Sequence, residues 1–302
     1  MLTAEQIKKR AFELGADLCG IGDIAGFDGT DPRHDPRQIL PKARTVIGFG
    51  FRIPRGLIRC MQSKVQYYNY LSLGVKYPEE DLSEIFLLKM AGLIEDAGYD
   101  ACVQRDLPNL KVKGDKSQNP EVLDTYELCC AVPVEPGKPS PEVILDFAQA
   151  AAVCGLGRAG LRGQVITPKY GPFVRFIFIV TDAPLDCAPP FGRTLCDGCG
   201  ACAGACPGHA VSDAGTDSWQ CSVYYRGAHR SNPFMSDDFL RGDPEREAIL
   251  NGEKRFDADA ARALYPKMRF LPSFSGYAPC LCGRACDAAC YEHLKEVGRL
   301  GL

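Results

Sequence analysis

Residues 196–207 of this 302-residue chain read CDGCGACAGACP, and this stretch decides how the C-terminal third folds. Its four cysteines follow the spacing Cys-x2-Cys-x2-Cys-x3-Cys-Pro, which is the spacing of bacterial ferredoxins. Thiolates three residues apart can wrap several irons of a cubane, and the small residues between them let backbone amides approach the sulfides. The stretch therefore predicts a four-iron cluster bound by Cys196, Cys199 and Cys202. Cys206 is predicted to serve a second cluster, as the fourth cysteine does in two-cluster ferredoxins.

The second cluster needs further cysteines, and the chain supplies them downstream. Nine of the sixteen cysteines lie between residues 196 and 290. Positions four apart stay on one face of a helix, which predicts a shared face for Cys282, Cys286 and Cys290. Cys280 is one cysteine more than the two clusters need. It could replace Cys282 as a ligand, or it could be a buried thiol. The predicted ligand sets are Cys196, Cys199, Cys202 and Cys290 for one cluster, and Cys206, Cys221, Cys282 and Cys286 for the other.

Zinc and disulfides are the alternative uses of so many cysteines. Zinc sites usually pair two separated Cys-x2-Cys segments, which fits this run of four less well. Disulfide scaffolds are short secreted chains, whereas this chain is long and begins without a signal peptide. The scattered remainder is predicted to consist mostly of buried thiols, with a reactive Cys129–Cys130 pair as the alternative. These cysteines are Cys19, Cys60, Cys102, Cys129, Cys130, Cys154 and Cys187.

Composition and charge favour a cytoplasmic globular protein. Hydrophobic residues make up 46% and charged residues 24%, as in ordinary soluble proteins. The formal net charge of −3 gives no overall basic field for nucleic acid. No apolar run approaches the roughly 20 residues that span a bilayer, so no membrane partner is expected.

Two regions with different patterns follow one another along the chain. We expect an α/β domain over residues 1–188 and a cysteine-rich domain over 189–302. The second region begins with Gly, Cys and Pro in little regular pattern, and a polar connector follows at about 229–267. Helices are expected at 4–14, 82–97 and 141–154, strands at 17–24, 45–51 and 173–181, and polar loops at 31–41 and 108–120.

The segment ahead of the cysteine run carries two further motifs. Residues 155–160 read GLGRAG, and residues 167–175 read TPKYGPFVR. The first follows a predicted helix rather than a strand, which is the wrong context for a dinucleotide-binding loop and favours a turn. Together with the cysteine run, these motifs resemble the epoxyqueuosine reductase and reductive dehalogenase superfamily.

This resemblance implies an α/β (α+β) fold, with a nitroreductase-like N-terminal domain followed by a ferredoxin-like domain with two [4Fe-4S] clusters. It also implies a corrinoid (cobalamin), although no Asp-x-His-x-x-Gly loop for a lower histidine ligand is present. We expect Tyr170 to donate a proton and Arg175 to polarise the substrate, and Asp146 is the acidic residue nearest the GLG motif. The expected cofactor-binding residues are Gly155, Gly157, Gly160, Tyr170, Gly171, Pro172 and Arg175.

The function expected from the resemblance is corrinoid-dependent reduction of a small organic substrate, with electrons from a ferredoxin or flavodoxin. A first alternative is a non-catalytic electron carrier or activator of a corrinoid partner, against which the large N-terminal region argues. A second is epoxyqueuosine reduction in tRNA. No dense Lys/Arg block supports that alternative, and such blocks supply most non-specific affinity for nucleic acid.

Overall fold

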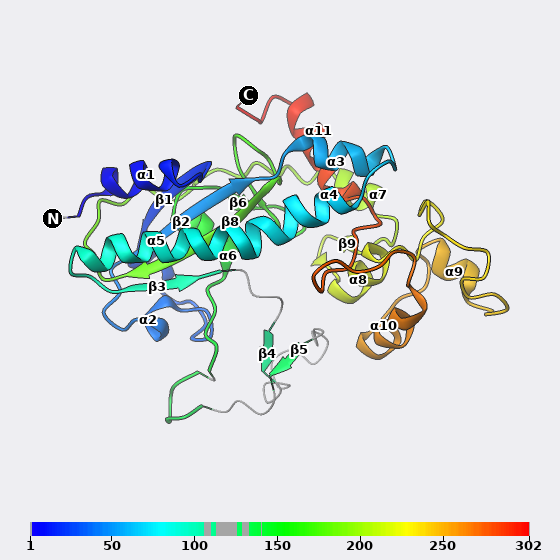
Figure 1. The fold of residues 1–302 in the computed structure, drawn as a ribbon, viewed down its shortest axis with the longest axis horizontal. Helices are drawn as coiled ribbons and strands as arrows, with labels where there is room; N and C mark the ends of the chain where they lie inside the picture. Colours follow the sequence, from blue (N-terminus) through cyan, green and yellow to red (C-terminus); the bar gives the residue numbers. More distant parts are fainter. Residues whose placement is uncertain (1, 106–109, 113–125, 129–132, 140, 302) are drawn as a thin grey trace.

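A four-stranded antiparallel sheet forms the centre of the N-terminal part (Figure 1), in the computed structural model of residues 2–105, 110–112, 126–128, 133–139 and 141–301. The strand order is β1-β2-β8-β3, so β2 and β8 are the inner strands. Their pairing aligns Ile47 with Ile179. The strands are β1 (Leu18–Asp23), β2 (Thr45–Arg52), β3 (Ala101–Gln104) and β8 (Val174–Thr181).

Both faces of this sheet are covered, which explains why the inner strands are apolar at successive positions. Side chains alternate between the faces of a strand. Phe49 and Ile179 pack with α1 (Ala4–Glu13) and α5 (Leu82–Asp96) on one face. Val46 and Phe178 pack with α6 (Phe147–Val153) on the other face. The fold is therefore a mixed helix-and-sheet structure, as expected.

Sequence reasoning located the first helix and the main strands closely. Thr3 caps α1, and Gln6 completes the expected capping box. Strands β1, β2 and β8 lie where they were predicted. The helix predicted at 82–97 is confirmed as α5, but its helical path starts earlier. A short helix α4 (Tyr68–Tyr70) and a π-helix η2 (Leu71–Asp81) run directly into it, although Pro78 lies inside.

The helix expected over 141–154 is shorter than predicted. Glu142 has a left-handed φ of 67°, which is incompatible with a helix. The Asp146 carboxylate accepts hydrogen bonds from the backbone amides of Ala148 and Gln149, so α6 begins only at Phe147. The expected loop at 31–41 contains the short helix α2 (Pro36–Ile39). Most of the loop expected at 108–120 lies outside the described residues, as do Cys129 and Cys130.

Glycines in β1 and β2 bring α6 close to the sheet. A Cβ atom at Gly20 would lie 2.0 Å from the carbonyl oxygen of Cys154, and one at Gly48 would lie 2.8 Å from the Leu156 side chain. These glycines let the turn after α6 rest directly on the strands.

Gly20→Ala is expected to lower the free energy of unfolding by about 1–3 kcal/mol, because the backbone of Cys154 cannot move away cheaply. Gly56→Ala is the control, since a Cβ there meets no atom within 4 Å inside α3 (Arg55–Gln62). It is expected to raise the free energy of unfolding by about 0.5–1 kcal/mol. Urea unfolding measures both, and equal effects would contradict this account of the packing.

The cysteine-rich part lies beyond one end of the sheet (Figure 1). The segment expected to be a polar connector at 229–267 contains α9, α10 and η3, and its residues Ile249, Phe256 and Leu264 are buried in a core shared with α8. Its apolar residues are spaced too widely for a simple period. The helices here are α7 (Ala201–Ala205), α8 (Ser218–Tyr225), α9 (Arg246–Leu250), α10 (Ala258–Leu264), η3 (Tyr265–Lys267) and α11 (Ala285–Glu296).

The remaining elements are short. They are η1 (Ile24–Phe27), β4 (Leu110–Val112), β5 (Tyr126–Leu128), β6 (Arg158–Ala159), β7 (Val165–Ile166), β9 (Val211–Ser212) and β10 (Gly215–Thr216).

None of the helices within the described residues combines the length and apolar character needed to cross a bilayer.

Candidate metal centre

The ferredoxin-like run forms a loop that leads into α7. Gly198 and Gly200 have φ values of 75° and 73°, a left-handed conformation that glycine adopts without strain. The loop turns twice within five residues and brings its thiols to one side. Helix α7 packs closely against α11, which carries two further cysteines.

Four cysteines line one small pocket between the loop and α11, and we call them the first group. Three come from the loop and α7, and Cys290 comes from α11. Gly160 packs against this group, because a Cβ there would lie 3.2 Å from the Cβ of Cys196. The GLGRAG motif therefore ends beside a predicted ligand. The first group consists of Cys196, Cys199, Cys202 and Cys290, the set predicted for one cluster.

A second group of four cysteines lies beside the first. Cys221 on α8 and Cys286 on α11 pack against Cys206, and Cys282 lies near enough to raise the pKa of Cys206 and of Cys221. Cys206 packs in one small hydrophobic cluster with Cys202 of the first group. The second group consists of Cys206, Cys221, Cys282 and Cys286, the set predicted for the other cluster.

The segment before α11 differs from the prediction of one continuous helix. Helix α11 begins at Ala285, so Cys286 and Cys290 are helical but Cys282 is not. Arg284 has a left-handed φ of 53° and interrupts the helical path. The Sγ atoms of Cys280 and Cys282 are 3.7 Å apart. Cys282 raises the pKa of Cys206 and of Cys221, whereas Cys280 is fully buried and lies near Tyr70.

Burial governs the protonation of the Cys221 and Cys290 thiols. It raises the pKa of Cys221 and of Cys290 to about 12. Without metal, both thiols stay protonated near neutral pH. Because iron binds the thiolate, assembly of a metal centre here must release protons.

Outside the two groups, the cysteines are mixed in their exposure. Cys154 is buried, as predicted, and its thiol donates to the carbonyl oxygen of Val46 at 3.2 Å. Cys187 is exposed, so the expectation of a buried thiol is wrong there. Cys19, Cys60 and Cys102 are half-buried.

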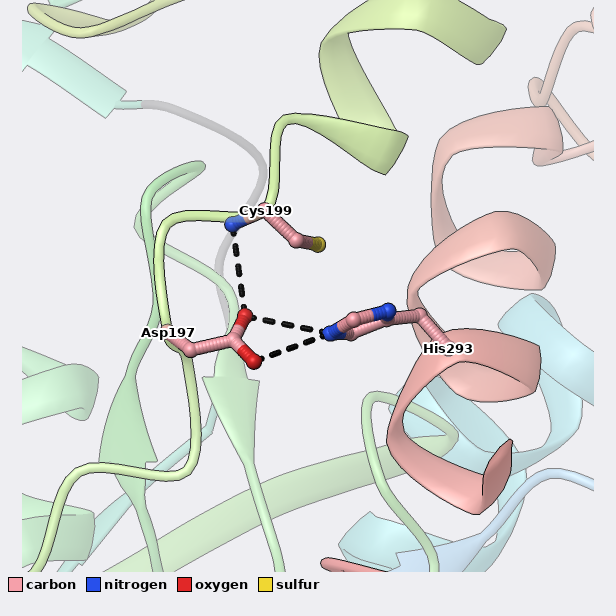
Figure 2. Close-up of side chains that lie close together, drawn as sticks. All are labelled: Asp197, Cys199 and His293. Carbon is pink, nitrogen blue, oxygen red and sulfur yellow. Dashed lines mark hydrogen bonds and ion pairs between the residues drawn. The ribbon is translucent and has the colours of Figure 1, made fainter. Parts of the chain in front are cut away.

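A carboxylate and an imidazole fasten the first group from outside (Figure 2). The Asp197 carboxylate accepts a hydrogen bond from the backbone amide of Cys199 at 3.2 Å and lies 2.9 Å from Nε2 of His293. Ligand atoms of these three residues lie within 4.8 Å of one another. Asp197, Cys199 and His293 could bind zinc only if Cys199 were not a ligand in the first group. The contacts instead tie the cysteine loop to α11.

Two arginines converge on one buried carboxylate between the two groups. Asp287, on α11 next to Cys286, is 3% exposed. Its Oδ1 accepts from Arg162, and its Oδ2 accepts from Nε of Arg284 at 2.5 Å. The arginine side chains are only 11% and 19% exposed. We call these three residues the Arg–Asp–Arg triad.

The glycines predicted to bind a corrinoid pack against the chain itself. A Cβ at Gly155 would lie 3.1 Å from the carbonyl oxygen of Pro189, and one at Gly157 would lie 2.4 Å from that of Ile166. Gly171 packs on Tyr291, because a Cβ there would lie 3.1 Å from the tyrosine ring, and Pro172 beside it is buried. In this structure these glycines serve close packing within the chain, and their role in binding a corrinoid stays a prediction.

The predicted catalytic residues are not brought together. Arg175 forms an ion pair with Glu79 at 3.0 Å and donates to the carbonyl oxygen of Gly74. Tyr170 is half-buried in the turn before β8, with the Lys169 ammonium 5.2 Å from its ring centroid. Asp146 caps α6. Their catalytic roles stay predictions, and each already has a structural role.

A cavity of about 390 Å³ lies between α3 and α11, beside both cysteine groups. Three of its alanines, Ala205, Ala285 and Ala289, directly precede Cys206, Cys286 and Cys290 in the chain. Phe173 and Tyr291 stack at 4.8 Å on another wall. The polar and charged lining residues are Arg55, Arg59, Gln62, Tyr291 and Glu292.

Sequence reasoning missed the charged residues around the cysteines. Asp197 lies between two predicted ligands, and Asp287 directly follows another, so their positions alone could have drawn attention. His293 follows Cys290 by one helical turn, a spacing that favours a shared face. Nothing in the sequence indicates that Arg162, which is 125 residues from Asp287, meets it.

Known proteins resemble this chain in sequence and in fold. An epoxyqueuosine reductase of Leadbetterella byssophila is 28% identical over 233 residues, 73% of this chain and 68% of that protein. One of Synechococcus is 33% identical over 90 residues, 30% of this chain and 27% of that protein. The tetrachloroethene reductive dehalogenase of Dehalobacter restrictus is 45% identical over 65 residues, 20% of this chain and 12% of that protein. The chain therefore covers only part of the length of several relatives.

The fold is similar to that of the catabolic reductive dehalogenase NpRdhA, with a TM-score of 0.51 at 15% identity over 88% of this chain and 34% of that one. No protein-family model matches. Fold and cysteine arrangement define a mixed helix-and-sheet protein with a ferredoxin-like cysteine run. The chain is similar to members of the superfamily of epoxyqueuosine reductases and reductive dehalogenases, as the sequence motifs predicted.

Proposed function

We propose that this chain is an iron–sulfur reductase in which each cysteine group binds one four-iron cluster. The observation that carries the proposal is the gathering of eight cysteines into two adjacent groups of four. Bound clusters of this kind accept and release single electrons. Two clusters can therefore store the two electrons that removal of a halide or an epoxide oxygen requires. An external donor of the ferredoxin or flavodoxin type would supply them.

The domain arrangement is part of the proposal. Residues 1–188 would form the nitroreductase-like domain around the four-stranded sheet. Residues 189–302 would form the ferredoxin-like domain with both clusters. The cores on the two faces of the sheet and the core around α8 support this division, and a further core that includes Phe173 and Tyr291 joins the two parts.

A small organic substrate would bind in the cavity between α3 and α11. Its volume of about 390 Å³ falls within the range of pockets for small molecules. Arg55 donates to the hydroxyl of Tyr291 at 2.9 Å. Arg59, one helical turn away, forms no ion pair with any residue that the structure describes. These guanidiniums favour a substrate with an anionic group, and the alanines keep its body near both cysteine groups.

A more specific version of this proposal is that the reductase depends on a corrinoid. The family resemblance is its only support. Because the predicted glycines pack against the chain, we derive no step through a corrinoid. Titration with cobalamin tests this form separately. A stoichiometric change in its visible spectrum would support it, and no change at stoichiometric concentrations would reject it.

Reduction of epoxyqueuosine in tRNA is the second candidate function. It is favoured by the epoxyqueuosine reductase of Leadbetterella byssophila, which aligns with 73% of this chain. Saturable binding of an RNA stem-loop at physiological salt would favour this function over the reduction of a small free substrate.

A single-turnover experiment tests the reductase proposal. Anaerobically reconstituted protein is reduced with dithionite, freed of excess reductant and mixed with 4-bromobenzoate. Two stored electrons and one proton replace bromide by hydrogen, so we expect up to about one bromide per chain with both clusters reoxidised. Arg59→Ala is expected to raise the 4-bromobenzoate concentration needed for half-maximal bromide release. It should leave the iron content unchanged. Stable reduced clusters and no bromide would instead favour the electron-carrier alternative.

A further inference from the structure

The two arginines of the Arg–Asp–Arg triad face different cysteine groups. Arg162 directly follows Leu161, which lines the pocket of the first group together with Cys202 and Cys290. Arg284 instead lies in the turn between Cys282 and Cys286 of the second group, two residues from each. The triad therefore spans the boundary between the groups, with one cation on each side.

The charges of the triad do not cancel. Two guanidiniums share one carboxylate, so the triad carries a net positive charge in a buried place. Each oxygen of Asp287 accepts from a different arginine, which fixes both cations in position. Burial limits screening by water and salt, so such charges act more strongly than surface charges do.

The backbone at Arg284 adds an independent observation. Its φ of 53° is a left-handed conformation that glycine adopts freely and other residues adopt at a cost. An arginine stands there nevertheless, and its side chain reaches Asp287. Strained backbone retained next to a site is an indication of function.

We infer that Arg162 and Arg284 are separate potential-setting residues, each raising the reduction potential of the cluster in the group that it faces. The inference rests on the proposed function, because it requires both groups to hold clusters. A cluster gains negative charge when it accepts an electron. A fixed cation beside it therefore favours the reduced form, and net charge is one of the factors that set cluster potentials. The triad would thereby set the order in which the two clusters fill with electrons.

The test is a redox titration of the anaerobically reconstituted full chain, followed by electron paramagnetic resonance. Arg162→Gln is expected to shift the oxidised-to-reduced ratio of the first-group cluster at least tenfold toward oxidised, which is about 59 mV for one electron. The second-group cluster should shift much less. Arg284→Gln should show the reverse selectivity. The Cys206→Ala variant, which retains the first group, assigns the signals.

Three kinds of control variant make the result decisive. Arg162→Lys and Arg284→Lys keep the charge and should keep the parent potentials. Arg241→Gln removes the same charge from an exposed ion pair with Asp238 and should shift neither cluster. Arg284→Gly removes the charge and relieves the backbone, and it should behave like Arg284→Gln.

Each remaining outcome is informative. Equal shifts of both clusters, or shifts no larger than that of Arg241→Gln, would overturn the inference. Loss of iron from the Gln and Gly variants alike, with retention in the Lys variants, would show that the arginines have a purely structural role and would also overturn the inference. A parent chain that binds fewer than two clusters would contradict the proposed function instead.

Discussion

Cys206→Ala is expected to halve the iron bound by the reconstituted chain, from about eight atoms to about four. Cys206 belongs to the second group, and its replacement leaves all four cysteines of the first group in place. Iron and acid-labile sulfide analysis measures the loss. The remaining signal should be that of one four-iron cluster.

The pair Cys280 and Cys282 provides the matched control. Cys282→Ala should reproduce the loss, because Cys282 faces Cys206 and Cys221. Cys280→Ala should retain about eight irons, because that thiol is fully buried in a hydrophobic core and lies near Tyr70. If Cys280→Ala loses iron and Cys282→Ala does not, the ligand assignment of the second group is wrong.

Asp287→Ala is expected to lower the free energy of unfolding by about 3–5 kcal/mol. It would leave the guanidiniums of Arg162 and Arg284 buried without the carboxylate that both contact. Removing one member of a buried ion pair costs more than the pair contributes, because the remaining charge stays desolvated. Anaerobic urea unfolding of the full chain measures the change.

Asp238→Ala is the control for this loss. Asp238 pairs with Arg241, and their side chains are 79% and 70% exposed. Such surface pairs contribute little, so the free energy of unfolding should change by less than about 1 kcal/mol. A similar loss in both variants would show that the buried triad contributes no more than a surface pair.

Local sequence patterns predicted the parts of the fold that depend on neighbouring residues. The Thr3 capping box, the apolar strand at Val174–Thr181 and the helix at Leu82–Asp96 were all predictable. The start of α6 was predicted too early. Pro141 suggested the first turn of a helix, whereas the cap is Asp146 and the helix begins at Phe147. The helical path through Pro78 was also missed, since proline usually ends a helix.

The candidate site shows the same division. Thiols at short, regular spacing predicted both cysteine groups, including Cys290 from a distant helix. The contacts that surround them depend on long-range packing. Arg162 meets Asp287, and Gln62 donates to the carbonyl oxygen of Gly283, across more than a hundred residues. Arg175 could not be assigned from its strand alone, because its partner Glu79 comes from the π-helix.

The most direct test of the account is the cluster content of anaerobically purified and reconstituted protein. Iron, sulfide and zinc analysis would be combined with electron paramagnetic resonance of the dithionite-reduced chain. We predict about eight irons and eight sulfides per chain, with the spectrum of two interacting four-iron clusters. Stoichiometric zinc, or no more than about four irons in the parent chain, would contradict the assignment of a cluster to each cysteine group.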